Sequence, residues 1–183
     1  AAEAEEEELD MCDCQLQEVP LLESPARLRR LLLARNELQA MRDPPPGVPC
    51  FASLVELDMS RNAVRDMRVL RLELMPALRV LRLSENRIAR VCGLERTVAL
   101  QQLHLAGNRV RAVSGLGHLK QLAVLDLRRN SIRTPASLRE LALSTALFEL
   151  WLEGCPLAGQ RRYRATVRHL LPALRVLDGT SLN

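Results

Sequence analysis

The stretch LRLSENRI, residues 81–88, decides the fold because the chain repeats its pattern of apolar residues and asparagine. The pattern is Leu-x-Leu-x-x-Asn-x-apolar, in which x is any residue. It recurs, once with methionine in a leucine place, around four other asparagines: Asn36, Asn62, Asn108 and Asn130. Self-similarity at a regular period is typical of proteins built from stacked repeats, so one short unit repeated along the chain defines the architecture.

Two further copies extend the pattern toward both ends of the chain, with cysteine in the asparagine place. The first copy spans residues 9–16 with Cys14, and the last spans residues 150–157 with Cys155. The seven key positions are separated by 22, 26, 24, 22, 22 and 25 residues. These spacings fall within the period of about 20–29 residues that leucine-rich repeats have.

The residue types explain how such a repeat folds. Each repeat supplies one short strand whose alternate leucines point inward, because strand side chains alternate in direction. The asparagine turns the chain out of the strand, and its amide can bond backbone groups of adjacent turns that would otherwise be buried unpaired. Cysteine fits the same place as a small side chain with a weak donor. We therefore predict an α/β leucine-rich-repeat solenoid: a curved right-handed horseshoe with parallel strands on the concave face, short helices and turns on the convex face, and a C-terminal helical cap.

The C-terminal residues read as this cap. Residues 160–171 predict a helix, since Tyr163, Val167 and Leu170 recur on one face at helical spacing, and Pro172 ends it. We interpret residues 1–183 as a single domain with about seven repeats over 1–159 and the cap over 160–183. The chain begins with Ala1 instead of Met, so we expect it to be part of a longer protein.

Charge and cysteine content bear on partners and location. The net charge is +4, but residues 1–13 hold seven acidic and no basic side chains, which leaves +11 on the rest and favours electrostatic steering of a partner. An odd number of cysteines, five, without paired spacing argues against a disulfide framework, and we expect an intracellular, cytoplasmic protein.

No apolar run is long enough to span a membrane, so we expect no membrane partner. The proline-rich segment 43–49 predicts a loop on the convex side or rim.

Strand residues between the leucines should form a partner-binding concave face. The candidates are Leu32, Asp58, Arg82, His104, Asp126, Phe148, Glu149 and Trp151. Trp151 either anchors a partner, as exposed tryptophans at interfaces do, or packs on the cap. Arg82, Asp58 and Asp126 either meet partner charges or pair with one another across strands. His104 is either a contact residue or simply solvated.

A second candidate surface is a basic patch around the cap helix. Its members are Arg161, Arg162, Arg164 and Arg168. The patch either meets acidic tails or phosphates, or is a solvated face. The sequence contains no phosphate-binding loop, metal-ligand spacing or nucleophile–base motif, so we predict no enzyme activity, no catalytic residues, no cofactor and no metal site. We do not expect nucleic acid as a partner, because aromatic side chains make up only 2% of the chain and acidic residues on the concave face would repel phosphate.

Nearly the whole chain resembles the short leucine-rich-repeat class typified by the regulatory subunit of protein phosphatase one. Residues 152–179 are similar to the C-terminal cap of that class, which axonemal dynein light chain, other ciliary repeat proteins, the spliceosomal A-prime protein and the mRNA export factor TAP also have. The departure is Cys155, where the class usually has asparagine. The resemblance implies a protein-binding scaffold in a cytoskeletal or ciliary (axonemal) assembly, with tubulin or dynein as partners. Its alternatives are a nuclear component of RNA processing or export and a phosphatase regulatory subunit.

Overall fold

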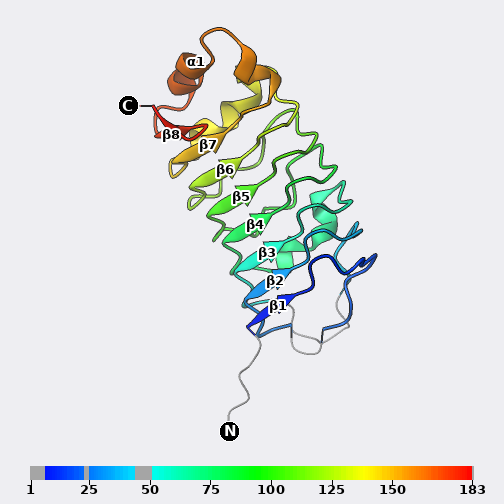
Figure 1. Cartoon of the computed structure of the whole chain (residues 1–183). Coiled ribbons are helices and arrows are strands. Elements are labelled where there is room, and N and C mark those ends of the chain that lie inside the picture. Colours follow the sequence, from blue (N-terminus) through cyan, green and yellow to red (C-terminus); the bar gives the residue numbers. More distant parts are fainter. Residues whose placement is uncertain (1–6, 23–24, 44–50, 183) are drawn as a thin grey trace.

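The strands form one continuous sheet in chain order. A computed structural model describes residues 7–22, 25–43 and 51–182 (Figure 1). Seven three-residue strands pair in parallel, each with the strand of the next repeat: β1 (Glu8–Asp10), β2 (Arg30–Leu32), β3 (Glu56–Asp58), β4 (Val80–Arg82), β5 (Gln102–His104), β6 (Val124–Asp126) and β7 (Glu149–Trp151). This arrangement is the leucine-rich-repeat solenoid that the sequence predicts.

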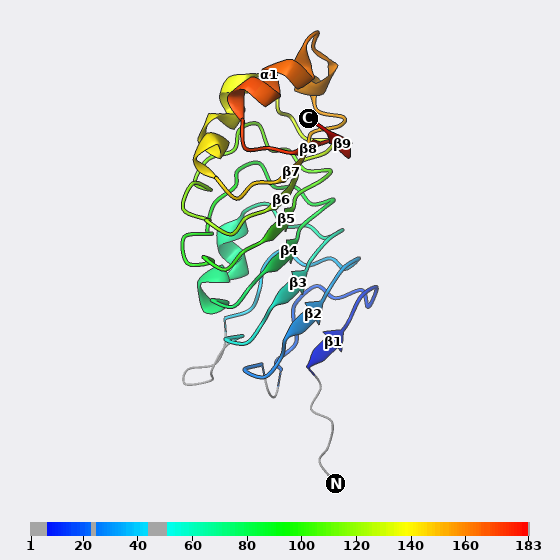
Figure 2. The same cartoon turned by 90° about the vertical axis from the view of Figure 1, so that its left-hand side faces the viewer.

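The return segments lie on the side opposite the strands. Figure 2 shows the strands along one side of the stack and short helices along the other. Four of these are 3₁₀ helices: η1 (Met67–Leu70), η2 (Leu72–Leu74), η3 (Pro135–Leu143) and η4 (Pro156–Gly159). Parallel strands need such crossover segments, and the short repeats leave room for only brief turns of helix.

The core is a stack of aliphatic layers. The middle leucine of each strand occupies one row in register, and from Leu31 to Leu150 this leucine is fully buried in every repeat. Leucines, valines and methionines of the return segments fill the space behind them, and Met59, Met67 and Met75 are completely buried. Full burial of such a side chain contributes about 1.5–3 kcal/mol, so stacking is the main source of stability.

The predicted asparagine ladder is present. In the central repeats, Asn108 donates from Nδ2 to the carbonyl oxygens of Leu83 at 2.8 Å and Leu105 at 3.0 Å, and its Oδ1 accepts from Ile88 N–H at 2.9 Å. Asn36, Asn62, Asn86 and Asn130 make equivalent bonds. The Cys155 thiol continues the ladder by donating to the Leu127 carbonyl oxygen at 3.1 Å. Each rung thus joins the strand end of one repeat to the next.

The C-terminal segment covers the open end of the core (Figure 1). Its helix α1 (Tyr163–Leu170) is shorter than predicted, because Arg162 has a left-handed backbone with φ 68° and separates α1 from η4. Strand β8 (Val176–Leu177) pairs in parallel with β7, and β9 (Thr180–Ser181) returns antiparallel to β8. The turn between β8 and β9 is Asp178-Gly179, with φ 49° and 70°. An Asp-Gly pair suits this turn because both residues tolerate positive φ.

Two features expected from the sequence fall outside the described residues. They are the acidic residues 1–6 and, apart from Asp43, the proline-rich segment 43–49. The described part of the acidic end joins the sheet: Glu8, in the edge strand β1, forms an ion pair with Arg30 at 2.6 Å.

Candidate protein-binding face

Six of the eight residues predicted to bind a partner lie in one row across the sheet, and Phe148 and Glu149 lie outside it. The parallel register places Leu32, Asp58, Arg82, His104, Asp126 and Trp151 next to one another in that order. Asp126 is buried, with 3% of its surface exposed, and the other five are half-buried. The alternation of inward leucines and outward polar residues thus produces a continuous face of mixed charge.

Glu56 organises the charges at the N-terminal half of this face. One Glu56 carboxylate oxygen lies 3.0 Å from Nε of Arg82, and the other lies 3.1 Å from Nε of Arg30. Arg82 therefore pairs with the neighbouring column of strand residues, not with Asp58 or Asp126, the partners considered from the sequence. Glu56 was missed because repeat spacing alone does not say which of two adjacent columns an arginine will reach.

Asp10 extends this row beyond Leu32, and we call the whole row the central row. Its aspartates share a local role at the end of each strand. Asp10, Asp58 and Asp126 each accept a hydrogen bond from the backbone N–H two residues later, at 2.9, 2.8 and 3.0 Å. Aspartate commonly makes this bond where a chain turns. The central row therefore combines turn-forming carboxylates with side chains that face solvent.

Four side chains at the C-terminal end form what we call the Trp151 cluster: Asp126, Arg128, Glu149 and Trp151. Arg128 binds Asp126 through Nε at 3.0 Å and Nη2 at 2.6 Å, and its guanidinium lies 4.8 Å from the centre of the Trp151 ring. Hydrogen bonding to Asp126 raises the pKa of Arg128, so the cation persists. The indole Nε1–H donates to Glu149 at 2.9 Å.

The cap holds the other side of Trp151. A Cβ atom added to Gly179 would lie 2.9 Å from Cη2 of the indole, so only glycine permits this approach. Trp151 therefore does pack on the cap, yet it stays half-exposed at the end of the binding row. The two interpretations from the sequence are compatible, since the contacts that hold the ring also present it rigidly.

Phe148 and His104 differ in exposure. Phe148 directly precedes β7 and is 52% exposed, at the opposite end of this strand from Trp151. His104 is half-buried between Arg82 and Asp126, and its Nε2 lies 3.3 Å from Oε1 of Gln102. Burial, followed by the charge of Arg82, lowers the pKa of His104. Its ring is therefore neutral at physiological pH and is not a simple solvated group.

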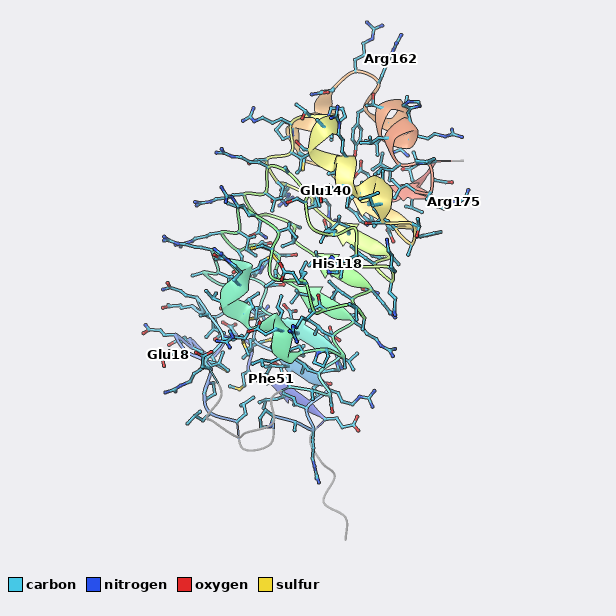
Figure 3. The ribbon with its side chains drawn as sticks, turned by 180° about the vertical axis from the view of Figure 1, so that it is seen from behind. Glu18, Phe51, His118, Glu140, Arg162 and Arg175 are labelled. Carbon is cyan, nitrogen blue, oxygen red and sulfur yellow. The ribbon has the colours of Figure 1, made fainter. Side chains whose placement is uncertain are left out.

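The basic patch expected on the cap separates into two roles. Arg164 is half-buried and donates to the carbonyl oxygens of Leu177 at 3.0 Å and Thr180 at 3.1 Å, which ties α1 to the terminal hairpin. Arg161, Arg162 and Arg168 are exposed. Figure 3 shows Arg162 at the far end of the stack, pointing away from the body of the protein.

Neither a metal-binding group of side chains nor a membrane-spanning helix is found among the described residues. No group of three histidine, cysteine, aspartate or glutamate side chains there is arranged to hold a metal ion. In the same residues, no helix has both the length and the apolar character that crossing a membrane requires.

Known structures share this architecture. A leucine-rich-repeat protein of Leptospira interrogans is 27% identical with a TM-score of 0.66, over 82% of this chain and 37% of that one. Internalin InlF of Listeria monocytogenes is 18% identical with a TM-score of 0.69, over 93% of this chain and 46% of that one. A chain of the Drosophila melanogaster SNF/U2A′ complex is 24% identical with a TM-score of 0.61, over 66% of this chain and 70% of that one.

These likenesses establish the class of fold. The protein is a leucine-rich-repeat solenoid. It spans less than half the length of the first two of these structures. No protein-family model and no curated protein sequence matches the chain.

Proposed function

We propose that this protein is a non-catalytic binding module that holds a partner protein on its concave face, with Trp151 and Phe148 as its anchors. The observation that carries the proposal is the Trp151 cluster. Its Arg128 and Glu149, together with Gly179 of the cap, hold a half-exposed indole in one orientation. A side chain that is already ordered loses little conformational entropy when a partner covers it. Tryptophan and arginine are also the residues that most often dominate binding energy at protein interfaces.

The charges on the face favour a partner of matching pattern. Near the N-terminal half, Glu56 pairs with Arg82 and Arg30, and Arg30 also pairs with Glu8, while Phe148 and Trp151 lie near the C-terminal half. A complementary partner would place an apolar patch over Phe148 and Trp151 and polar groups over the charged half. Trp151 lies on the row of mixed charge, so one protein surface can cover both parts.

For the biological setting we propose a cytoskeletal or ciliary assembly in the cytoplasm, with tubulin or dynein subunits as the first partners to test. The support is the resemblance of residues 152–179 to the C-terminal cap of axonemal repeat proteins. A nuclear ribonucleoprotein component is the second candidate. The support for it is the likeness to a chain of the SNF/U2A′ complex, which agrees with the resemblance to the spliceosomal A-prime protein.

The test measures binding of the purified chain to purified tubulin, axonemal dynein, SNF-type ribonucleoprotein and phosphatase-one catalytic subunit. Trp151→Ala should weaken the true interaction at least tenfold, because truncating an interface anchor costs about 2 kcal/mol or more. Val98→Ala is the matched control, since Val98 is 57% exposed and lies outside the strands. The partner that binds selects the setting. Equal binding by wild type, Trp151→Ala and Phe148→Ala would refute the concave-face assignment.

A further inference from the structure

Six exposed arginines follow the ladder asparagines of four consecutive repeats. We call them the arginine flank: Arg65, Arg87, Arg90, Arg109, Arg111 and Arg133. Each stands one, three or four residues after its asparagine, at positions that alternate with buried residues such as Ile88 and Val110. These positions leave the strand end and begin the return segment, so they lie away from the central row of the concave face.

The ladder aligns these side chains along one edge of the solenoid. Arg87 N–H donates to Val64 and Arg109 N–H to Ile88, both at 2.8 Å, so equivalent positions repeat from turn to turn. Adjacent turns of such a stack are about 4.8 Å apart. Glu18, which stands four residues after Cys14 as Arg90 does after Asn86, marks this edge in Figure 3. Long nitrogen-tipped side chains project along the edge beyond it.

The flank is a concentration of positive charge that the protein itself does not neutralise. Some arginines elsewhere pair with carboxylates of neighbouring repeats, as Arg61 does with Glu85 at 3.0 Å. Within residues 7–22, 25–43 and 51–182, none of the six flank arginines has a carboxylate at ion-pair distance. Asp66 adjoins Arg65, but it is held by Arg68 with Nη2 2.6 Å from Oδ2, and that pairing lowers the pKa of Asp66.

The centre of the flank is hollowed. A groove of about 800 Å³ runs beside Arg90, Arg109 and Arg111. Its remaining lining consists mainly of small side chains, namely Ala89, Ala112, Ser114 and Ser131. Small residues between the arginines leave the guanidinium groups open to a ligand. The groove thus offers three guanidinium groups to a ligand segment that carries negative charge.

We propose that the arginine flank binds an extended acidic polypeptide segment, rich in glutamate or aspartate, as a second binding surface separate from the concave face. Guanidinium groups bind carboxylates through paired hydrogen bonds, which suits a row of arginines facing a row of acidic side chains. Single-stranded nucleic acid is disfavoured because binding its bases requires aromatic stacking. The described aromatic side chains lie elsewhere: Trp151 ends β7, Phe148 directly precedes that strand, and Phe51 and Tyr163 are buried.

The experiment titrates the whole chain into a fluorescein-labelled oligoglutamate peptide of about twelve residues, long enough when extended to pass all four repeats. Fluorescence anisotropy reports binding at low and at physiological ionic strength. An oligoglutamine peptide and a short single-stranded oligonucleotide are parallel probes. The flank variants are Arg109→Gln with Arg111→Gln and, independently, Arg87→Gln with Arg133→Gln. The matched control is Arg161→Gln with Arg162→Gln, which removes the same charge from the cap.

Oligoglutamate should bind the wild-type chain and oligoglutamine should not. Each flank pair should weaken oligoglutamate binding at least tenfold and reduce its salt dependence, while the cap pair should change it less than threefold. Trp151→Ala should leave it unchanged, which separates this proposal from the function proposed for the concave face. Three results would overturn the proposal: no oligoglutamate binding, equal losses in flank and cap variants, or tighter binding of the oligonucleotide than of oligoglutamate.

Discussion

Truncating Asn108 to alanine should lower the free energy of unfolding by about 3 kcal/mol. Asn108 has 7% of its surface exposed and makes three hydrogen bonds at 2.8–3.0 Å, to the backbone of Leu83, Leu105 and Ile88. Each such bond contributes about 1 kcal/mol net. Alanine would leave one N–H and two carbonyl groups in the interior of the stack with fewer partners, and water has little access to replace them.

The natural ladder offers a control for this prediction. Cys155 occupies the same place with one thiol donor, 3.1 Å from the Leu127 carbonyl oxygen. Asn108→Cys should therefore recover about one of the three bonds and lose about 2 kcal/mol. Urea unfolding followed by far-UV circular dichroism measures both losses, and an unchanged slope against urea would show that the folded and unfolded states still differ by the same exposed surface.

If Asn108→Ala lost less than about 1 kcal/mol at an unchanged slope, the amide bonds would contribute little and leucine packing alone would hold the turns together. If Asn108→Cys were less stable than Asn108→Ala, the assignment of the Cys155 thiol as a functioning rung would be wrong.

Two further predictions concern Trp151 and His104. Gly179→Ala should lower the free energy of unfolding by about 1–2 kcal/mol and shift the fluorescence maximum of Trp151, because the added Cβ would contact the indole and φ of this residue is +70°. Gly159→Ala is the control and should change neither, because no atom lies near its added Cβ. The pKa of His104 in the folded state lies below 6.5, so the unfolded chain takes up a proton at higher pH than the folded chain does. The contribution of His104 to the free energy of unfolding should therefore stay constant above pH 6.5 and decrease as the pH falls below it. His104→Gln should weaken the dependence of the free energy of unfolding on pH, measured by urea unfolding at several pH values. An unchanged pH dependence would contradict the burial of the ring.

The concave row could be located from the sequence, but its contacts could not. The repeat spacing assigns Asp58, Arg82, His104 and Asp126 to one row, and the strand register confirms it. Which charges meet depends on side-chain reach between columns. Arg82 therefore pairs with Glu56, while Asp126 pairs with Arg128 two residues along its own chain. The separation of Arg164 from the exposed cap arginines likewise depends on where the terminal hairpin folds back.

The solenoid could be predicted from the sequence, because stacking the repeats both buries the periodic leucines and lets each asparagine satisfy the buried backbone of adjacent turns. Folding alone sets how Trp151 is presented, since Arg128 comes from the preceding repeat and Gly179 from the cap hairpin. It also gathered arginines from four repeats onto one uncompensated flank. The periodicity of leucine and asparagine can be read from the sequence, whereas contacts between residues far apart in sequence form only after the turns have stacked.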